Sequence, residues 1–125
     1  MWSKEAKHRT RTYTGVTMEQ VASLLEQHLT DTKATIHNIE KDDEGISFDG
    51  RRSMTWTTNF LAFHVLIHKR GDSIVVVLDA KDSSLLNTSA QIYVGKIFKR
   101  VDGDVTKLGG TVEGGMSDNA PSGAS

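Results

Sequence analysis

Cysteine is absent from this sequence of 125 residues, and proline occurs only once. Without a thiolate, the chain cannot form a disulfide, a thiolate zinc site, an iron–sulfur cluster or a cysteine nucleophile. A chain of this length buries enough surface to fold as one domain without such cross-links. We therefore expect one domain that is stabilised by its own core, with no cofactor and no metal.

Long apolar runs and an excess of one charge are missing as well. The amino-terminal residues MWSKEAKHRTR contain no apolar segment of the kind that a secretory signal needs. No run approaches the roughly 20 apolar residues that span a bilayer. The formal net charge is −1, which provides no overall field for binding nucleic acid. We expect a cytoplasmic protein that does not enter a membrane.

Two segments carry the apolar period of a helix. Thr17 to Gln20 matches a capping box, and the apolar residues that follow predict a helix from about Thr17 to Leu29. If Gly103 does not break it, a second helix is about 33 Å long, at about 1.5 Å per residue. Its apolar residues recur every three or four positions, at Leu86, Ala90, Val94, Ile97, Val101, Val105 and Leu108.

The remaining segments have strand character, which gives the order β-α-β-β-β-β-α. This order predicts an α+β fold, in which the long carboxy-terminal helix packs on a mostly antiparallel sheet of about five strands. Residues 1–108 form this single domain, and the glycine- and serine-rich residues 109–125 are expected to be a flexible tail. The strand segments are His8 to Thr14, Lys33 to Lys41, Ile46 to Phe48, Phe60 to His68 and Ile74 to Ala80, with Arg51 to Thr58 ambiguous.

Two conspicuous motifs lie between Phe63 and Ser73. The tetrapeptide RGDS at 70–73 joins two apolar strands, and the need of a tight turn for glycine and aspartate accounts for it without a role in adhesion. His64 and His68 are four residues apart, a spacing that on a helix would let them share a metal ion. On a strand the same spacing is about 13 Å. The β-branched context favours a strand and therefore argues against a shared ion.

The segment from Phe60 to His68 is apolar on both faces of the expected strand. A sheet with water on one side normally shows a polar alternate face. The second face therefore indicates a covering layer, a cavity or a subunit contact. One face carries Leu61, Phe63, Val65 and Ile67, and the other carries Phe60, Ala62, His64, Leu66 and His68.

The sequence supports three functional hypotheses, and no catalytic motif such as a phosphate loop or a nucleophile elbow is present. The leading one is a small non-enzymatic binding or interaction module that uses the apolar sheet face to contact a protein partner or a second copy. The alternative is a pocket for a small apolar ligand, in an element order that resembles helix-grip folds at the level of topology only. That pocket would be lined by Trp56, Phe60, His64 and Tyr93.

The third hypothesis is contact with nucleic acid through the basic amino-terminal strand. Basic residues interleaved with an aromatic residue are typical of such surfaces, but a charged edge strand shows the same pattern. The net charge near zero favours the edge strand. The residues concerned are Arg9, Arg11, Arg51 and Arg52.

Overall fold

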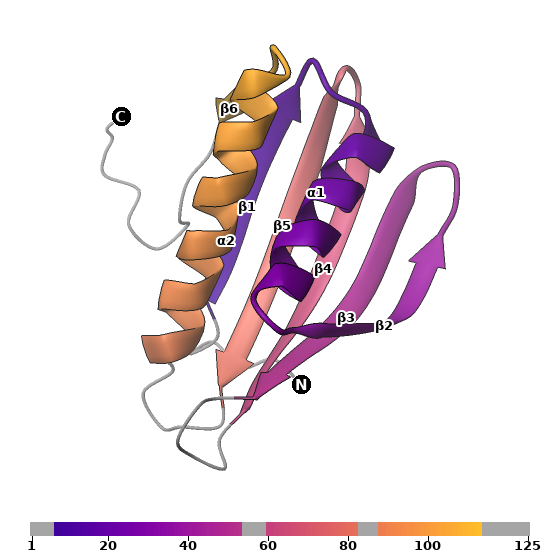
Figure 1. Ribbon diagram of the computed structural model, residues 1–125. Helices are drawn as coiled ribbons and strands as arrows, with labels where there is room; N and C mark the ends of the chain where they lie inside the picture. Colours follow the sequence, from indigo (N-terminus) through magenta and orange to yellow (C-terminus); the bar gives the residue numbers. More distant parts are fainter. Residues whose placement is uncertain (1–6, 54–59, 83–87, 114–125) are drawn as a thin grey trace.

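The computed structural model describes residues 7–53, 60–82 and 88–113. Its strands form one six-stranded sheet in the order β2-β3-β4-β5-β1-β6, and all neighbours pair antiparallel. Both helices lie on the same face of this sheet (Figure 1). The elements are β1 (Lys7–Thr14), α1 (Met18–Asp31), β2 (Thr35–Lys41), β3 (Gly45–Ser53), β4 (Phe60–Arg70), β5 (Ser73–Asp82), α2 (Thr88–Lys107) and β6 (Thr111–Glu113).

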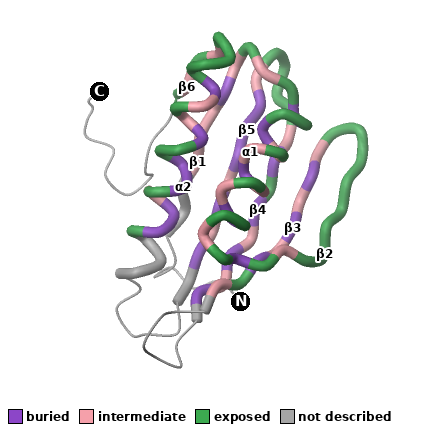
Figure 2. Tube along the Cα trace, in the orientation of Figure 1, coloured by how far each residue is buried: buried purple, intermediate pink, exposed green. Residues whose placement is uncertain are grey.

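The predicted α+β fold, with the carboxy-terminal helix packed on the sheet, is confirmed. The core lies between the helices and the sheet, where α1 packs on β3 and β4 and α2 packs on β5 and β1. Buried stretches concentrate in the central strands β4 and β5, whereas β2 is exposed along most of its length (Figure 2). The fully buried helix residues include Val21, Leu25 and Leu29 of α1 and Ile97, Phe98, Val101 and Val105 of α2.

The predicted start of α1 is confirmed in detail. The hydroxyl of Thr17 accepts a hydrogen bond from the backbone N–H of Gln20 at 3.0 Å, and the Gln20 side chain accepts one from the backbone N–H of Thr17 at 2.8 Å. This reciprocal pair satisfies two backbone donors that a helix start would otherwise leave without partners.

The second helix continues through Gly103 and ends at Lys107. The residues on either side of this glycine hold the helix in place, because Asp102 accepts hydrogen bonds from Arg11 of β1 and Asp104 lies 2.6 Å from His28 Nε2 of α1. Tertiary contacts therefore offset the roughly 1 kcal/mol that a glycine costs inside a helix.

Two parts of the sheet differ from the sequence-based expectation. Residues 45–53 form the single strand β3, whereas the sequence predicted a short strand at 46–48 and an ambiguous segment at 51–58. Residues 54–58 of that segment lie outside the described ranges. Residues 111–113, which were expected to belong to the tail, form β6 against β1. This strand has only three residues, of which only Val112 is apolar, so its sequence shows no alternation of apolar and polar residues. It joins the sheet through main-chain pairing with Thr12–Thr14. Residues 114–125 lie outside the described part.

The RGDS motif is a hairpin turn, as predicted. Arg70 pairs with Ser73 at the ends of β4 and β5, so Gly71 and Asp72 form the two-residue loop. Gly71 has a φ of 61°, in the region that a tight hairpin turn requires and that glycine adopts without strain. No helix within the described ranges is long and apolar enough to cross a membrane.

Candidate functional site

The candidate site is the sheet face opposite the helices, which we call the open face. Successive side chains of a strand point to opposite faces, so in β4 the buried residues Leu61 and Phe63 point to the helices and His64 and Leu66 point away. Both helices lie on the other side of the sheet (Figure 1). Among the described residues, no element covers the open face.

Three apolar residues form the centre of the open face. Leu66 of β4 lies opposite Val77 of β5, and Val75 is one pair further along the same face. Val75 is 5% exposed and Leu66 is 40% exposed. Thr10 and Thr12 of β1 flank the two valines on the next strand. We call Leu66, Val75 and Val77 the apolar centre.

A hydrogen-bonded polar group borders the apolar centre. His64 Nδ1 lies 2.7 Å from Asp49 Oδ1, and because an ionised carboxylate only accepts hydrogen bonds, the histidine nitrogen is the donor. Asn38 Nδ2 donates to Asp49 Oδ2 at 3.0 Å. These bonds, first the one from His64 and then the one from Asn38, hold the pKa of Asp49 below its ordinary value.

The pairing register places histidine and aspartate alternately across four neighbouring strands. His37 of β2 lies opposite Asp49 of β3, which lies opposite His64 of β4, which lies opposite Asp79 of β5. Within the described ranges, no three histidine or acidic residues form a group that could hold a metal ion. The arrangement is therefore a row of alternating acids and bases on the open face. This row could not be predicted from the sequence, because its pairs are separated by 12 to 15 positions and depend on the register.

Replacing His64 by glutamine should raise the pKa of Asp49 toward its ordinary value of 3.8. A carboxyl group whose pKa is depressed in the folded state contributes stability above its unfolded pKa, and this contribution is lost as the pH falls through the lower folded pKa. The variant should therefore lose less stability on acidification below about pH 4. Carboxyl NMR titration and unfolding curves between pH 2 and pH 6 test both effects. Asn38→Ala should give a smaller rise, and an unchanged Asp49 pKa in His64→Gln would contradict the assignment.

Two of the four residues predicted to line a ligand pocket, His64 and Tyr93, have described side chains, and these lie on opposite faces of the sheet. His64 is on the open face, whereas Tyr93 of α2 is buried on the opposite side, with its ring centroid 6.2 Å from that of Phe63. The Tyr93 hydroxyl and the Thr32 hydroxyl lie 2.6 Å apart. The sheet thus separates His64 from Tyr93. Trp56 and the side chain of Phe60 lie outside the described part of the chain.

The three described side chains among the arginines predicted to contact nucleic acid, those of Arg11, Arg51 and Arg52, do not form one patch. Arg11 Nε donates to Asp102, and its guanidinium lies 4.8 Å from the ring centroid of Phe98. Arg52 Nε donates to the Thr32 carbonyl at 2.7 Å and its guanidinium lies over Tyr93. These two arginines hold the helices to the sheet from strands that β4 and β5 separate.

The other two arginines of that group lie elsewhere. Arg51 is exposed in β3, next to Arg52 but on the alternate face of the strand. Arg9 belongs to β1, and its side chain is outside the described part.

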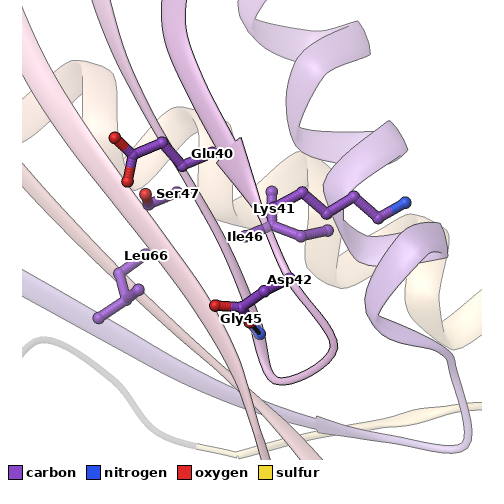
Figure 3. A pocket seen from close by; sticks show the side chains of 7 residues that line it. All are labelled: Glu40, Lys41, Asp42, Gly45, Ile46, Ser47 and Leu66. Atoms are coloured by element: carbon purple, nitrogen blue, oxygen red, sulfur yellow. Dashed lines mark hydrogen bonds between the residues drawn. The ribbon is translucent and has the colours of Figure 1, made fainter.

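A hollow extends the open face toward the β2–β3 hairpin. It has a volume of about 310 Å³. Figure 3 shows Glu40, Ser47 and Leu66, from three neighbouring strands, on one side of the sheet, while Lys41 extends in the other direction. The apolar centre is therefore continuous with a polar recess. The lining residues are Glu40, Lys41, Asp42, Gly45, Ile46, Ser47 and Leu66.

The fold resembles a known structure. The crystal structure of the vertebrate conserved region (VCR) of human METTL16 matches this chain with a TM-score of 0.51 and 19% sequence identity, over 70% of this chain and 77% of that one. At this level of identity the likeness concerns the fold alone. No protein-family model matches the sequence, and no curated protein gives a significant match.

Proposed function

We propose that this chain is a small non-enzymatic binding module whose open face packs against a second copy of the chain. The observation that carries the proposal is an apolar centre on a sheet face that no described element covers, while the other face is packed against two helices. Two sheets that pack face to face lie about 10 Å apart, and their side chains interdigitate between them. Leu66, the most exposed residue of the apolar centre, is the residue most suited to insert into a partner.

The size of the open face supports this proposal. Six strands about 4.8 Å apart, each about eight residues long at about 3.3 Å per residue, define an area on the order of 600 Å². The side chains make the surface uneven, so the area available for contact is larger than this estimate for a flat sheet. A stable interface buries about 800 Å² on each partner, so the open face is about large enough for one subunit contact.

The polar groups around the apolar centre are also suited to a subunit interface. Such interfaces have an apolar core and a polar rim with satisfied hydrogen bonds. Asp49 and His64 already satisfy each other, so covering them does not leave an isolated charge. The threonines of β1 present short side chains that permit close approach of another sheet.

Light scattering at several protein concentrations tests the proposal. The chain should show a mass that rises from the monomer value of 13.7 kDa toward twice that value. Leu66→Asp places a charge in the apolar centre and should shift the equilibrium to the monomer by at least tenfold, about 1.4 kcal/mol. Ile92→Asp is the matched control, because Ile92 is 66% exposed on α2. A wild-type chain that stays monomeric at several hundred micromolar would overturn the proposal.

A further inference from the structure

The outer edge of β2 is a second surface that the proposed dimer does not use. β2 is at the end of the sheet and pairs only with β3, and no other described strand lies on its outer side (Figure 1). An edge strand presents a row of backbone N–H and C=O groups to solvent. At the opposite end of the sheet, β6 has only three residues. β2, with seven residues, therefore offers the longer exposed edge.

A bulge in β2 turns a second isoleucine toward α1. His37 pairs with Asp49 and Glu40 pairs with Ser47, so Asn38 and Ile39 together face the single residue Phe48. Asn38 has a φ of 56°, and its side chain reaches Asp49 on the open face. The extra residue brings Ile39 to the helix side of the strand, where it is 55% exposed.

A groove lies between this edge and α1. It is shallow and open to solvent, with a volume of about 510 Å³. Ile36 and Ile39 make its apolar floor, and a polar stripe of α1 makes its wall. All six lining residues are at least partly exposed: Ser23, Glu26, Gln27, Thr30, Ile36 and Ile39.

The acidic residues of α1 beside the groove favour a ligand with positive charge. α1 contains Glu19, Glu26 and Asp31 but no lysine or arginine. Glu26 lines the groove directly. At the far end of β2, Lys41 lies 3.9 Å from Glu19, so the nearby lysine is already close to an acid of the same helix. An occupant that carries positive charge would therefore be favoured over an acidic one.

We propose that the edge of β2 and the groove beside α1 bind an extended peptide that carries an apolar residue and a lysine or arginine two positions apart, on the same face of the added strand. The peptide backbone pairs with β2 as an added strand. One of its apolar side chains enters the groove over Ile36 and Ile39, and a basic side chain reaches Glu26. The bulge limits regular backbone pairing along β2 to a short stretch. A short stretch is enough to bind a peptide but disfavours edge-to-edge pairing with the sheet of another molecule.

A titration of the full chain with a defined peptide tests this proposal. The probe is a blocked seven-residue peptide in which valine and lysine alternate along one face of the extended chain and threonine occupies the other face. Binding is followed by the backbone amide NMR signals of the protein. Shift changes should concentrate in Thr35–Lys41 and in the facing residues of α1, and amide exchange in β2 should slow. Two matched probes should bind at least tenfold more weakly: the valine–glutamate peptide, and the valine–lysine peptide with alternate backbone amides methylated.

Three variants of the chain separate this site from the open face. Ile39→Ser and Glu26→Lys should each weaken the valine–lysine peptide at least tenfold, whereas Leu66→Asp should leave its affinity within twofold. Equal binding of the glutamate or methylated peptide would overturn the proposal, as would shift changes that map to the apolar centre. The proposal would also be overturned if two copies of the chain paired through β2 and the peptide did not displace that pairing. The dimer proposal does not depend on any of these outcomes.

Discussion

Replacing Gly50 by alanine is expected to destabilise the protein by about 3 kcal/mol, at the upper end of the cost of overpacking a core. Gly50 is buried in β3 opposite Phe63 of β4. A Cβ atom at this position would lie 2.2 Å from both Cε1 and Cζ of the Phe63 ring. Phe63 is 2% exposed and packs near Tyr93, so its ring has little room to move away. Urea unfolding of the variant gives the loss directly.

A double-mutant cycle distinguishes this steric cause from a general effect of alanine in a strand. Phe63→Leu removes the ring atoms that the new methyl group would strike, so Gly50→Ala should cost at least 1 kcal/mol less in that background. Gly45→Ala is a useful comparison in the same strand, because its Cβ would approach no atom closer than 3.1 Å. Equal losses for Gly50→Ala with and without Phe63→Leu would exclude the steric explanation.

Gly50 also illustrates what the sequence could not reveal about the fold. The helical periods of α1 and α2, the capping box at Thr17 and the RGDS turn depend on residues close together in the chain, and local patterns were sufficient to predict them. The glycine that makes room for Phe63 depends on pairing between β3 and β4. β6 likewise depends on its pairing with β1, since three residues carry no period of their own.

The candidate site was predictable in outline and not in composition. The alternation of residues from Phe60 to His68 predicts a second apolar face, and this face is part of the open face. The partners of His64 were not predictable, because Asp49 reaches it only through the register between two strands. Tyr93 shows the converse error: its aromatic side chain was grouped with His64, but the two lie on opposite sides of the sheet because α2 covers only one face.

Replacing Asp102 by alanine is expected to cost about 2–4 kcal/mol, because one carboxylate serves two buried or partly buried donors. Tyr13, which is fully buried, donates its hydroxyl to Asp102 Oδ1 at 2.8 Å. Arg11 Nε donates to the same carboxylate at 3.1 Å. Burial, and then the adjacent carboxylate, raise the pKa of Tyr13, so its hydroxyl stays protonated and remains a donor at all ordinary pH values.

The loss of stability in Asp102→Ala should come from the unpaired donors of Arg11 and Tyr13, and not from the alanine at this position of the helix. Asp102→Asn keeps one acceptor oxygen and should cost about half as much as Asp102→Ala, measured by urea unfolding. In a background of Tyr13→Phe and Arg11→Met, which removes both donors, Asp102→Ala should cost less than about 1 kcal/mol. If the cost stayed the same there, the carboxylate would not be the link between α2 and β1. A reduced cost would mean that this one acid, beside a glycine that weakens the helix, links α2 to β1 through Arg11 and Tyr13.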